Sequence, residues 1–199
     1  GGGEFLISTL GKTSLPNTEY HKRLTEQELD KLIEKVKVYE EENNLLWQAE
    51  KLRIIQDNLK ALYPDRPLEV YGIVSFFPTY VNIEMFHPDR PDEIDEYGYS
   101  LATTTWEKKD PIWLNPAIAD WYRRELEEME FANVTKVYKH ALAYVAEHAL
   151  TSNTGKPIPF IQLLPHREED IEFRVYLKGG RDMHTLLYDE QGTFIERKE

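Results

Sequence analysis

The sequence predicts an α+β protein in which an antiparallel sheet packs against helices. Two observations lead to this fold class. Along the 199 residues, segments with helical spacing of apolar residues precede segments in which apolar and polar residues alternate, and this order occurs twice. The strand-like segments are joined by short connections rich in turn-forming residues, which favour antiparallel pairing. A hydrophobic fraction of 41% is enough for a sizeable core.

The N-terminal residues carry little pattern. Gly1 to Phe5 resembles a remnant of recombinant expression, and residues 6–23 read as an arm because turn formers are spread through them. We therefore expect residues 1–23 to be a remnant and a flexible arm. The length of the remainder suits one domain, so residues 24–199 are expected to form a single α+β domain.

The first helix has a well-defined start. Thr25 and Glu28 have the T-x-x-E spacing of a capping box, and Leu24 and Leu29 occupy the positions of a hydrophobic staple. A capping box satisfies two backbone amides at once, the third amide of the helix and the amide of the cap itself. We therefore expect a helix to begin at Thr25.

Two arrangements are open for the residues that follow. Helical apolar spacing runs from Leu29 to Val36 and resumes from Leu45 to Leu62, with an interruption at Glu40 to Asn44. The segment is either a helical hairpin that turns near Asn44 or one long helix from Thr25 to Tyr63. We favour the hairpin, because asparagine is a poor helix former.

A first group of strands is expected after Pro64. Leu68 to Phe77 is a largely apolar run, which predicts a central strand covered on both faces. Tyr80 to Phe86 and Tyr97 to Trp106 each alternate in the manner of a strand. The simplest topology for these three segments is an antiparallel meander.

A second pair of helices and a second group of strands complete the pattern. Asn115, followed by proline, predicts a helix that runs to about Glu130, and Asn133 is expected to cap another helix that reaches His148. A loop is expected at Thr151 to Pro157. The remaining strands are predicted at residues 158–164, 171–177, 183–188 and 193–195, with turns at Gly179-Gly180 and Gln191-Gly192.

The composition excludes several classes of partner and site. The 24 basic and 36 acidic residues give a net charge of −12, which argues against binding nucleic-acid phosphates or anionic lipid. The same charge would attract a basic protein or metabolite at long range. Absence of cysteine excludes disulfides, thiolate zinc sites and a cysteine nucleophile. No apolar run approaches the ~20 residues that span a bilayer. We expect a cytoplasmic protein, although a removed signal peptide would leave no trace.

The most informative segment is acidic. Five carboxylates and one arginine lie within the eight residues from Asp89 to Glu96, between two strand patterns. Pro88 and Pro91 predict a loop, because proline cannot donate a backbone hydrogen bond. An acidic hairpin tip suits a basic partner, and aromatic residues beside it would add contact area. The predicted partner-binding residues are Asp89, Asp92, Glu93, Asp95, Glu96, Tyr97 and Tyr99.

Catalytic and metal motifs find little support. His140, Glu147 and His148 share a helical face, but a spacing of seven residues is roughly 10 Å along the axis, too far for one ion. The acidic segment lacks the ligand spacing of an EF-hand calcium loop. Asp182 and His184 would share one strand face, which is common without any catalytic role. We predict no catalytic residue, no metal ligand and no cofactor.

Three functional interpretations follow. The leading one is a non-enzymatic binding protein that engages a basic protein partner, for example a bacterial immunity or inhibitor protein that blocks a toxin. The second is an enzyme or small-ligand-binding domain whose site is built from scattered Tyr, His and carboxylate residues. The third is a structural domain of a larger assembly that docks through the helices between Thr25 and Tyr63. The oligomeric state is not predicted.

Overall fold

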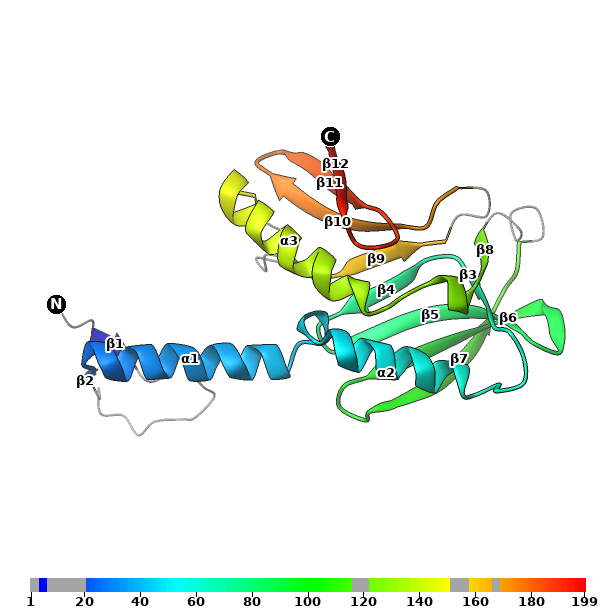
Figure 1. Ribbon diagram of the computed structural model, residues 1–199, viewed down its shortest axis with the longest axis horizontal. Helices are drawn as coiled ribbons and strands as arrows, with labels where there is room; N and C mark the ends of the chain where they lie inside the picture. Colours follow the sequence, from blue (N-terminus) through cyan, green and yellow to red (C-terminus); the bar gives the residue numbers. More distant parts are fainter. Residues whose placement is uncertain (1–3, 7–20, 116–121, 151–157, 166–168) are drawn as a thin grey trace. The chain divides into compact units, whose positions relative to one another are not determined.

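The computed structural model describes residues 4–6, 21–115, 122–150, 158–165 and 169–199 (Figure 1). The chain divides into two compact units, residues 1–41 and residues 42–199. The loop expected at Thr151 to Pro157 lies outside the described residues. In the described part of the chain, no helix is both long enough and apolar enough to cross a membrane.

The first unit holds a small strand pair and most of a helix. Strand β1 (Glu4–Leu6) pairs antiparallel with β2 (His21–Arg23), and α1 spans Glu26–Glu42. The predicted capping box is confirmed: the Glu28 amide donates to Thr25 Oγ1 at 3.2 Å, and the Thr25 amide donates to Glu28 Oε2 at 3.1 Å.

The interruption predicted after the first helix is confirmed and the single long helix is wrong, whereas the hairpin arrangement stays a prediction. α1 ends at Glu42, a 3₁₀ helix η2 follows at Leu45–Trp47, and α2 spans Ala49–Lys60. Asn44 explains the break, because its side-chain oxygen accepts a hydrogen bond from the Leu46 amide at 2.9 Å and so caps the 3₁₀ helix.

The second unit is built on one antiparallel sheet of ten strands. This confirms the predicted α+β class. The sheet is larger than the three-strand meander expected from the sequence. The sheet order is β12-β11-β10-β9-β4-β5-β6-β7, and β3 and β8 continue beside the far half of β5. The strands are β3 (Glu69–Tyr71), β4 (Val74–Phe77), β5 (Tyr80–His87), β6 (Arg90–Ser100), β7 (Thr105–Ile112), β8 (Arg123–Glu125), β9 (Ile161–Leu164), β10 (Glu172–Gly179), β11 (Asp182–Tyr188) and β12 (Phe194–Lys198).

The prediction that the acidic segment between two strands is a loop is wrong. Only a tight turn follows His87, and β6 already begins at Arg90. Pro91 fits there because the register shifts at Phe86/His87, so residues 91–93 have no partner on β5 and the missing proline amide breaks no ladder bond.

Two further element predictions are corrected. Tyr97 to Trp106 is not one strand, because a turn separates β6 from β7 and Thr104 adopts a left-handed φ of 56°. In the described part of the predicted Asn115 to Glu130 helix, the chain forms β8 and a 3₁₀ helix η4 (Leu126–Glu128). The helix α3 (Asn133–His148) is confirmed, with Ala132 rather than Asn133 at the N-cap.

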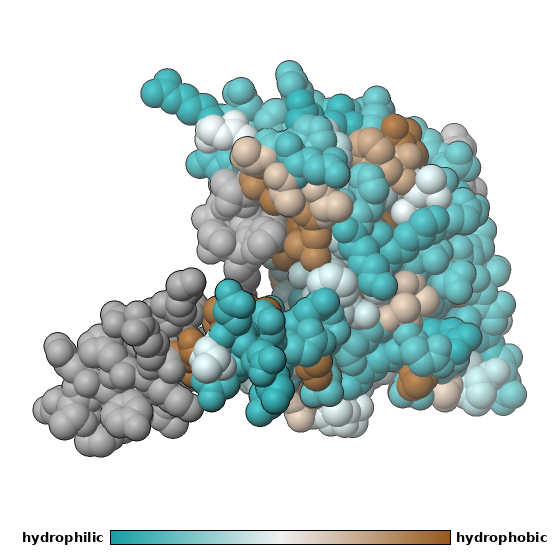
Figure 2. All heavy atoms as spheres, turned by 60° about the vertical axis from the view of Figure 1, so that its left-hand side comes forward, coloured by the Kyte–Doolittle hydropathy of each residue, from teal (hydrophilic) through white to brown (hydrophobic). Residues whose placement is uncertain are grey.

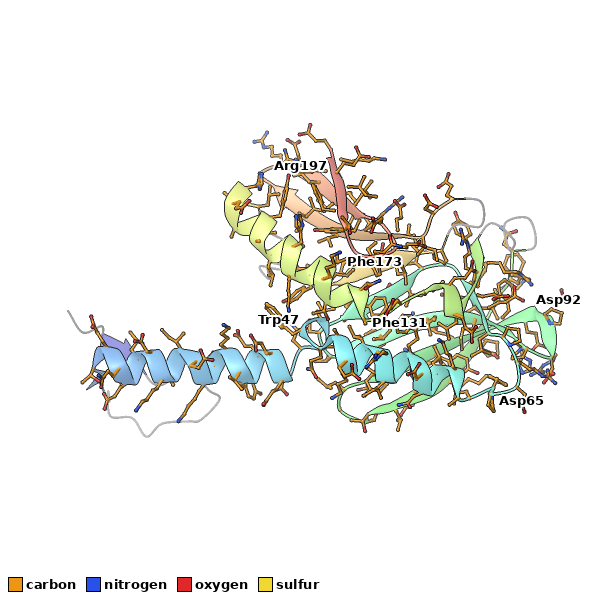
Figure 3. The ribbon with its side chains drawn as sticks, in the orientation of Figure 1. Trp47, Asp65, Asp92, Phe131, Phe173 and Arg197 are labelled. Atoms are coloured by element: carbon orange, nitrogen blue, oxygen red, sulfur yellow. The ribbon has the colours of Figure 1, made fainter. Side chains whose placement is uncertain are left out.

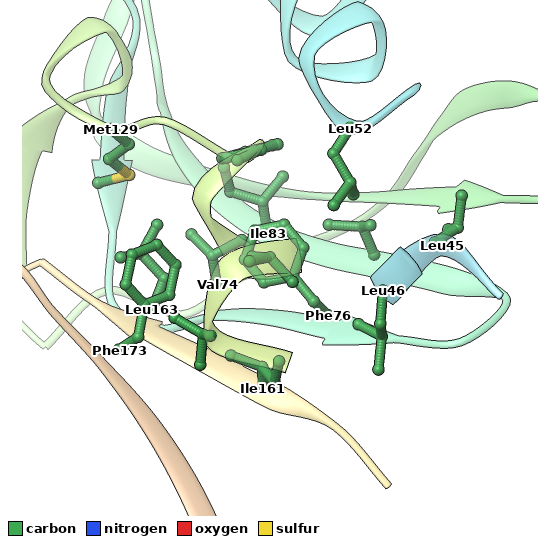
Figure 4. Close-up of a cluster of buried hydrophobic side chains, with 14 of the residues drawn as sticks. Leu45, Leu46, Leu52, Val74, Phe76, Ile83, Met129, Ile161, Leu163 and Phe173 are labelled. Atoms are coloured by element: carbon green, nitrogen blue, oxygen red, sulfur yellow. The ribbon is translucent and has the colours of Figure 1, made fainter. Parts of the chain in front are cut away.

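The core lies between one face of the sheet and the helices. Both α2 and α3 cover the same face (Figure 1), and buried leucines of η2 and α2 meet alternating apolar residues of the strands (Figure 4). Phe76 of β4 packs edge-to-face on Phe131 with ring centroids 5.0 Å apart. The Trp106 indole donates to the Ile55 carbonyl at 2.9 Å, which joins β7 to α2.

Candidate ligand-binding hollow on the open sheet face

The opposite face of the sheet carries a row of polar side chains. Because side chains alternate along a strand, the residues between the buried ones point away from the helices. Four of these lie directly opposite one another on β5, β4, β9 and β10, where Asn82 pairs with Ser75, Ser75 with Gln162, and Gln162 with Arg174. We call Asn82, Ser75, Gln162 and Arg174 the polar row.

An aromatic row runs beside the polar row. Its members lie two residues away from those of the polar row along each segment, and so share the same face. The ring centroids of Tyr80 and Phe77 are 5.1 Å apart, those of Phe77 and Phe160 are 5.5 Å apart, and those of Phe160 and Tyr176 are 6.1 Å apart. This row gives the polar row one apolar flank.

A hollow of about 540 Å³ lies over the polar row. Its wall on the side away from the aromatic row includes Tyr71, Glu84 and Tyr122, and Leu164 and Pro165 also line it. Ligand pockets in proteins are typically of about 300–1,000 Å³ and combine apolar walls with a few convergent polar groups. The hollow has both properties.

A glycine brings two tyrosines to this wall. Gly72 separates β3 from β4 with a φ of +70°, a conformation that favours glycine, and its amide donates to the Tyr122 carbonyl at 3.2 Å. The break explains why the expected single strand from Leu68 to Phe77 is two strands. A Cβ on Gly72 would lie 3.6 Å from the Glu84 carboxylate, so this carboxylate reaches the backbone at the kink.

Glu84 is the acidic side chain among the residues that line the hollow. Burial raises the pKa of its carboxyl group, and the negative charge of Glu96 raises it further. These two glutamates are register partners on β5 and β6. Within the described part of the chain, no cationic side chain lies within 4 Å of the Glu84 carboxylate. Tyr71 is affected in turn, because burial, Glu84 and Tyr122 all raise the pKa of its phenol.

The positive charge of the hollow is already compensated. Arg174 Nε donates to Glu172 Oε1 at 3.0 Å, and Nη2 donates to the same oxygen. Burial works against the charge of Arg174, but hydrogen bonds to Glu172 and Tyr176 outweigh it and raise the pKa of the guanidinium. Arg174 therefore enters the hollow as half of an ion pair.

Asn82 contributes an unused acceptor. Its side-chain oxygen is buried and has no hydrogen-bond partner among the described residues. Buried polar atoms without a partner are uncommon, because each one loses its bonds to water and gains none in return. Asn82 lies on the same face of β5 as Glu84, so two oxygen acceptors are neighbours at the hollow, and that of Asn82 is shielded from solvent.

The acidic residues predicted from the sequence lie elsewhere and are mostly neutralised within the chain. Asp92 lies at the far tip of the β5–β6 hairpin (Figure 3). Among the described residues, every other member of the acidic set has a cationic partner. The pairs are Asp89 with Arg66, Glu93 with Arg90 at 3.2 Å, Asp95 with Lys108 at 3.2 Å and Glu96 with Lys109 at 3.7 Å.

The two tyrosines predicted beside the tip are not on the surface. Tyr97 and Tyr99 are 5% and 3% exposed and belong to the core on the helix-covered face. Asp95 is also buried, at 2% exposure. Of the predicted partner-binding residues, those in the β5–β6 turn and at the start of β6 are therefore the accessible ones.

Two of the histidines singled out in the sequence, His140 and His148, have local partners. His140 Nδ1 lies 2.9 Å from the Tyr188 hydroxyl, and its ring stacks on Phe194. His148 Nδ1 lies 2.9 Å from the Tyr144 carbonyl oxygen. His184 is buried while Asp182 is exposed, so these two do not form a pair at the surface. The described residues contain no group of three His, Asp or Glu side chains placed to hold one metal ion.

The comparisons with known proteins are sparse. No protein-family model matches the chain, and no curated protein matches it. Among solved structures, a protein described as a "putative lipoprotein" from Clostridium difficile 630 is similar at 12% sequence identity, with a TM-score of 0.49. The match covers 78% of this chain and 98% of that chain. At this level the similarity supports no inference about function.

Proposed function

We propose that the protein is a non-enzymatic binding protein and that the hollow on the open sheet face holds its ligand. One observation carries this proposal: a space of about 540 Å³ in which a row of polar groups, two tyrosines and the Glu84 carboxylate, which has no cationic partner among the described residues, converge. Such convergence in a concave site is typical of small-molecule binding.

The chemistry of the hollow suits holding a ligand better than transforming one. Ser75 supplies the only hydroxyl of the polar row, and its register partners are the amides Asn82 and Gln162. None of the described residues that line the hollow is a histidine, lysine or cysteine. A serine nucleophile needs a base within hydrogen-bond reach, and the amide side chains beside Ser75 cannot act as one.

The test is a ligand screen read by thermal shift, with a variant that fills the hollow. Ser75→Trp places a large ring in the centre of the polar row. Thr105→Trp is the matched control, because Thr105 is exposed on the same sheet face and lies outside the hollow. Ligands should stabilise the wild type and the control but not Ser75→Trp. Ligands that stabilise all three proteins equally would place the binding site elsewhere.

A second candidate is capture of a basic protein partner by the acidic tip, in a cytoplasmic immunity or inhibitor role. The observation that favours it is the exposure of Asp92 at the end of the hairpin, with Asp89 exposed and Glu93 half-buried beside it (Figure 3). The acidic composition supports it, and the surface seen in Figure 2 is mostly hydrophilic, with apolar side chains in small patches. Charged surfaces of this kind increase association rates with oppositely charged partners.

A further inference from the structure

We infer that the group held in the hollow is an organic cation, an ammonium or guanidinium group carried by a small molecule or by a basic side chain of a partner. This inference rests on the proposed binding function and names the chemical class of the ligand. The structure supports it in three steps, which concern the unpaired carboxylate, the acceptors beside it and the compensated arginine.

The unpaired carboxylate is exceptional within this sheet. Among the described strands, the other carboxylates that are buried or half-buried each lie within 4 Å of a cationic side chain, and Glu84 does not. Desolvation without a partner disfavours a charge, whereas a nearby opposite charge restores it. The compensated carboxylates are Glu69 with Arg123, Glu93 with Arg90, Asp95 with Lys108, Glu96 with Lys109, and Glu172 with Arg174.

The groups around Glu84 are those that a cation requires. Asn82 lines the hollow beside Glu84, and its shielded side-chain oxygen is an acceptor without a partner among the described residues. Tyr71 and Tyr122 supply aromatic rings in the same wall, and aromatic rings attract organic cations. An ammonium or guanidinium group offers several donors at once, enough for both Glu84 and Asn82.

Arg174 does not make the hollow an anion site. Its guanidinium already binds the Glu172 carboxylate through Nε and Nη2. An anionic ligand would have to compete with Glu172 and would lie beside the negative charge of Glu84. A cationic ligand meets neither obstacle, so the charges in the hollow favour it.

The experiment uses three molecules with one ring system and different head groups. Tryptamine carries an ammonium, tryptophol a hydroxyl and indole-3-acetate a carboxylate. We expect calorimetry on the full chain to show tryptamine binding about tenfold tighter than tryptophol, because a charged hydrogen bond is worth that ratio. A second arm compares blocked Gly-Lys-Gly with its norleucine analogue, and tighter binding of the lysine peptide than of tryptamine would assign the cation to a protein side chain.

Two variants fix the role of the carboxylate. Glu84→Gln should remove the preference for tryptamine while retaining tryptophol binding. Glu107→Gln should change neither, because Glu107 is an exposed carboxylate on the same face outside the hollow. Equal binding of tryptamine and tryptophol to the wild type would overturn the inference and leave the binding function intact. Failure of every probe to bind at millimolar concentration would overturn both.

Discussion

Gln56 should be the most stability-sensitive polar residue of the fold. Its side chain is 4% exposed on α2 and bonds to three backbone groups of one segment. Nε2 donates to the carbonyls of Leu126 at 3.1 Å and Met129 at 2.8 Å, and Oε1 accepts from the Phe131 amide at 2.9 Å. Among the described residues the Met129 carbonyl and the Phe131 amide have no other partner, so the glutamine joins α2 to the chain that leads into α3.

The expected loss can be worked out from these bonds. In Gln56→Leu the Leu126 carbonyl keeps its bond from the Met129 amide, but the Met129 carbonyl and the Phe131 amide lose the partners described here. Each unpaired buried group costs about 1–3 kcal/mol, so the free energy of unfolding should fall by about 3 kcal/mol. For a chain of this size that corresponds to a Tm lower by roughly 10 °C.

Urea denaturation followed by circular dichroism measures this change. Asn58→Leu is the matched control, since Asn58 is exposed on the same helix and its replacement should change stability by about 0.5 kcal/mol or less. If Gln56→Leu unfolds within about 1 kcal/mol of the control, at an equal dependence on urea, the three bonds do not hold the segment and the reasoning is refuted.

The remaining predictions concern one residue or residue pair each. Thr25→Ala should destabilise α1 by ~1 kcal/mol, because the Glu28 amide loses its cap; unchanged helicity by circular dichroism would contradict this. Burial raises the pKa of Glu84 above its ordinary value of 4.5, so the protonated form is favoured in the folded state and stability is lost as pH rises through the folded-state pKa. Glu84→Gln should therefore be more stable than wild type at pH 7, with no difference well below pH 4.5, as measured by urea unfolding at both pH values. Neutralising Asp92 and Glu93 together should slow association with a basic partner recovered by affinity capture and flatten its salt dependence; identical rates would remove the tip from the interface.

The parts of the fold that could be predicted from the sequence depend on short-range signals. The capping box at Thr25 joins residues three apart, and α3 repeats its apolar positions within one helix. The β10–β11 hairpin is marked by its own turn, where Gly180 has a φ of +64°. In each case the residues that determine the element lie within it, so the pattern is complete before the chain folds.

The parts that could not be predicted depend on distant partners. The residues from Arg123 to Glu130 are good helix formers, yet β8 forms because β3 offers it a ladder and Gln56 binds the residues that follow. The acidic segment was predicted as a loop from its prolines, but β7 pairs with β6 and supplies Lys108 and Lys109 to Asp95 and Glu96. In these segments tertiary contacts, and not local propensity, determine the secondary structure.

The polar row was hidden for the same reason. The alternation that exposes Asn82 and Arg174 is visible within each strand, but the register that aligns them is set by four segments spread over about a hundred residues. A strand alternating between apolar and polar residues indicates a wet face and does not say which polar groups on that face will meet. The candidate site therefore emerges only with the sheet.

Glu84 allows the structural and functional explanations of the hollow to be separated. A residue that serves the fold should lower stability when it is replaced, and any loss of ligand binding should follow from that damage. Glu84 lies on a central strand, its charge is desolvated, and its neighbour Glu96 is a like charge. Its replacement by glutamine should therefore raise stability at neutral pH and at the same time weaken cation binding. Opposite signs in the two measurements would identify a group retained for its ligand, whereas a joint loss of stability and binding would identify a structural carboxylate.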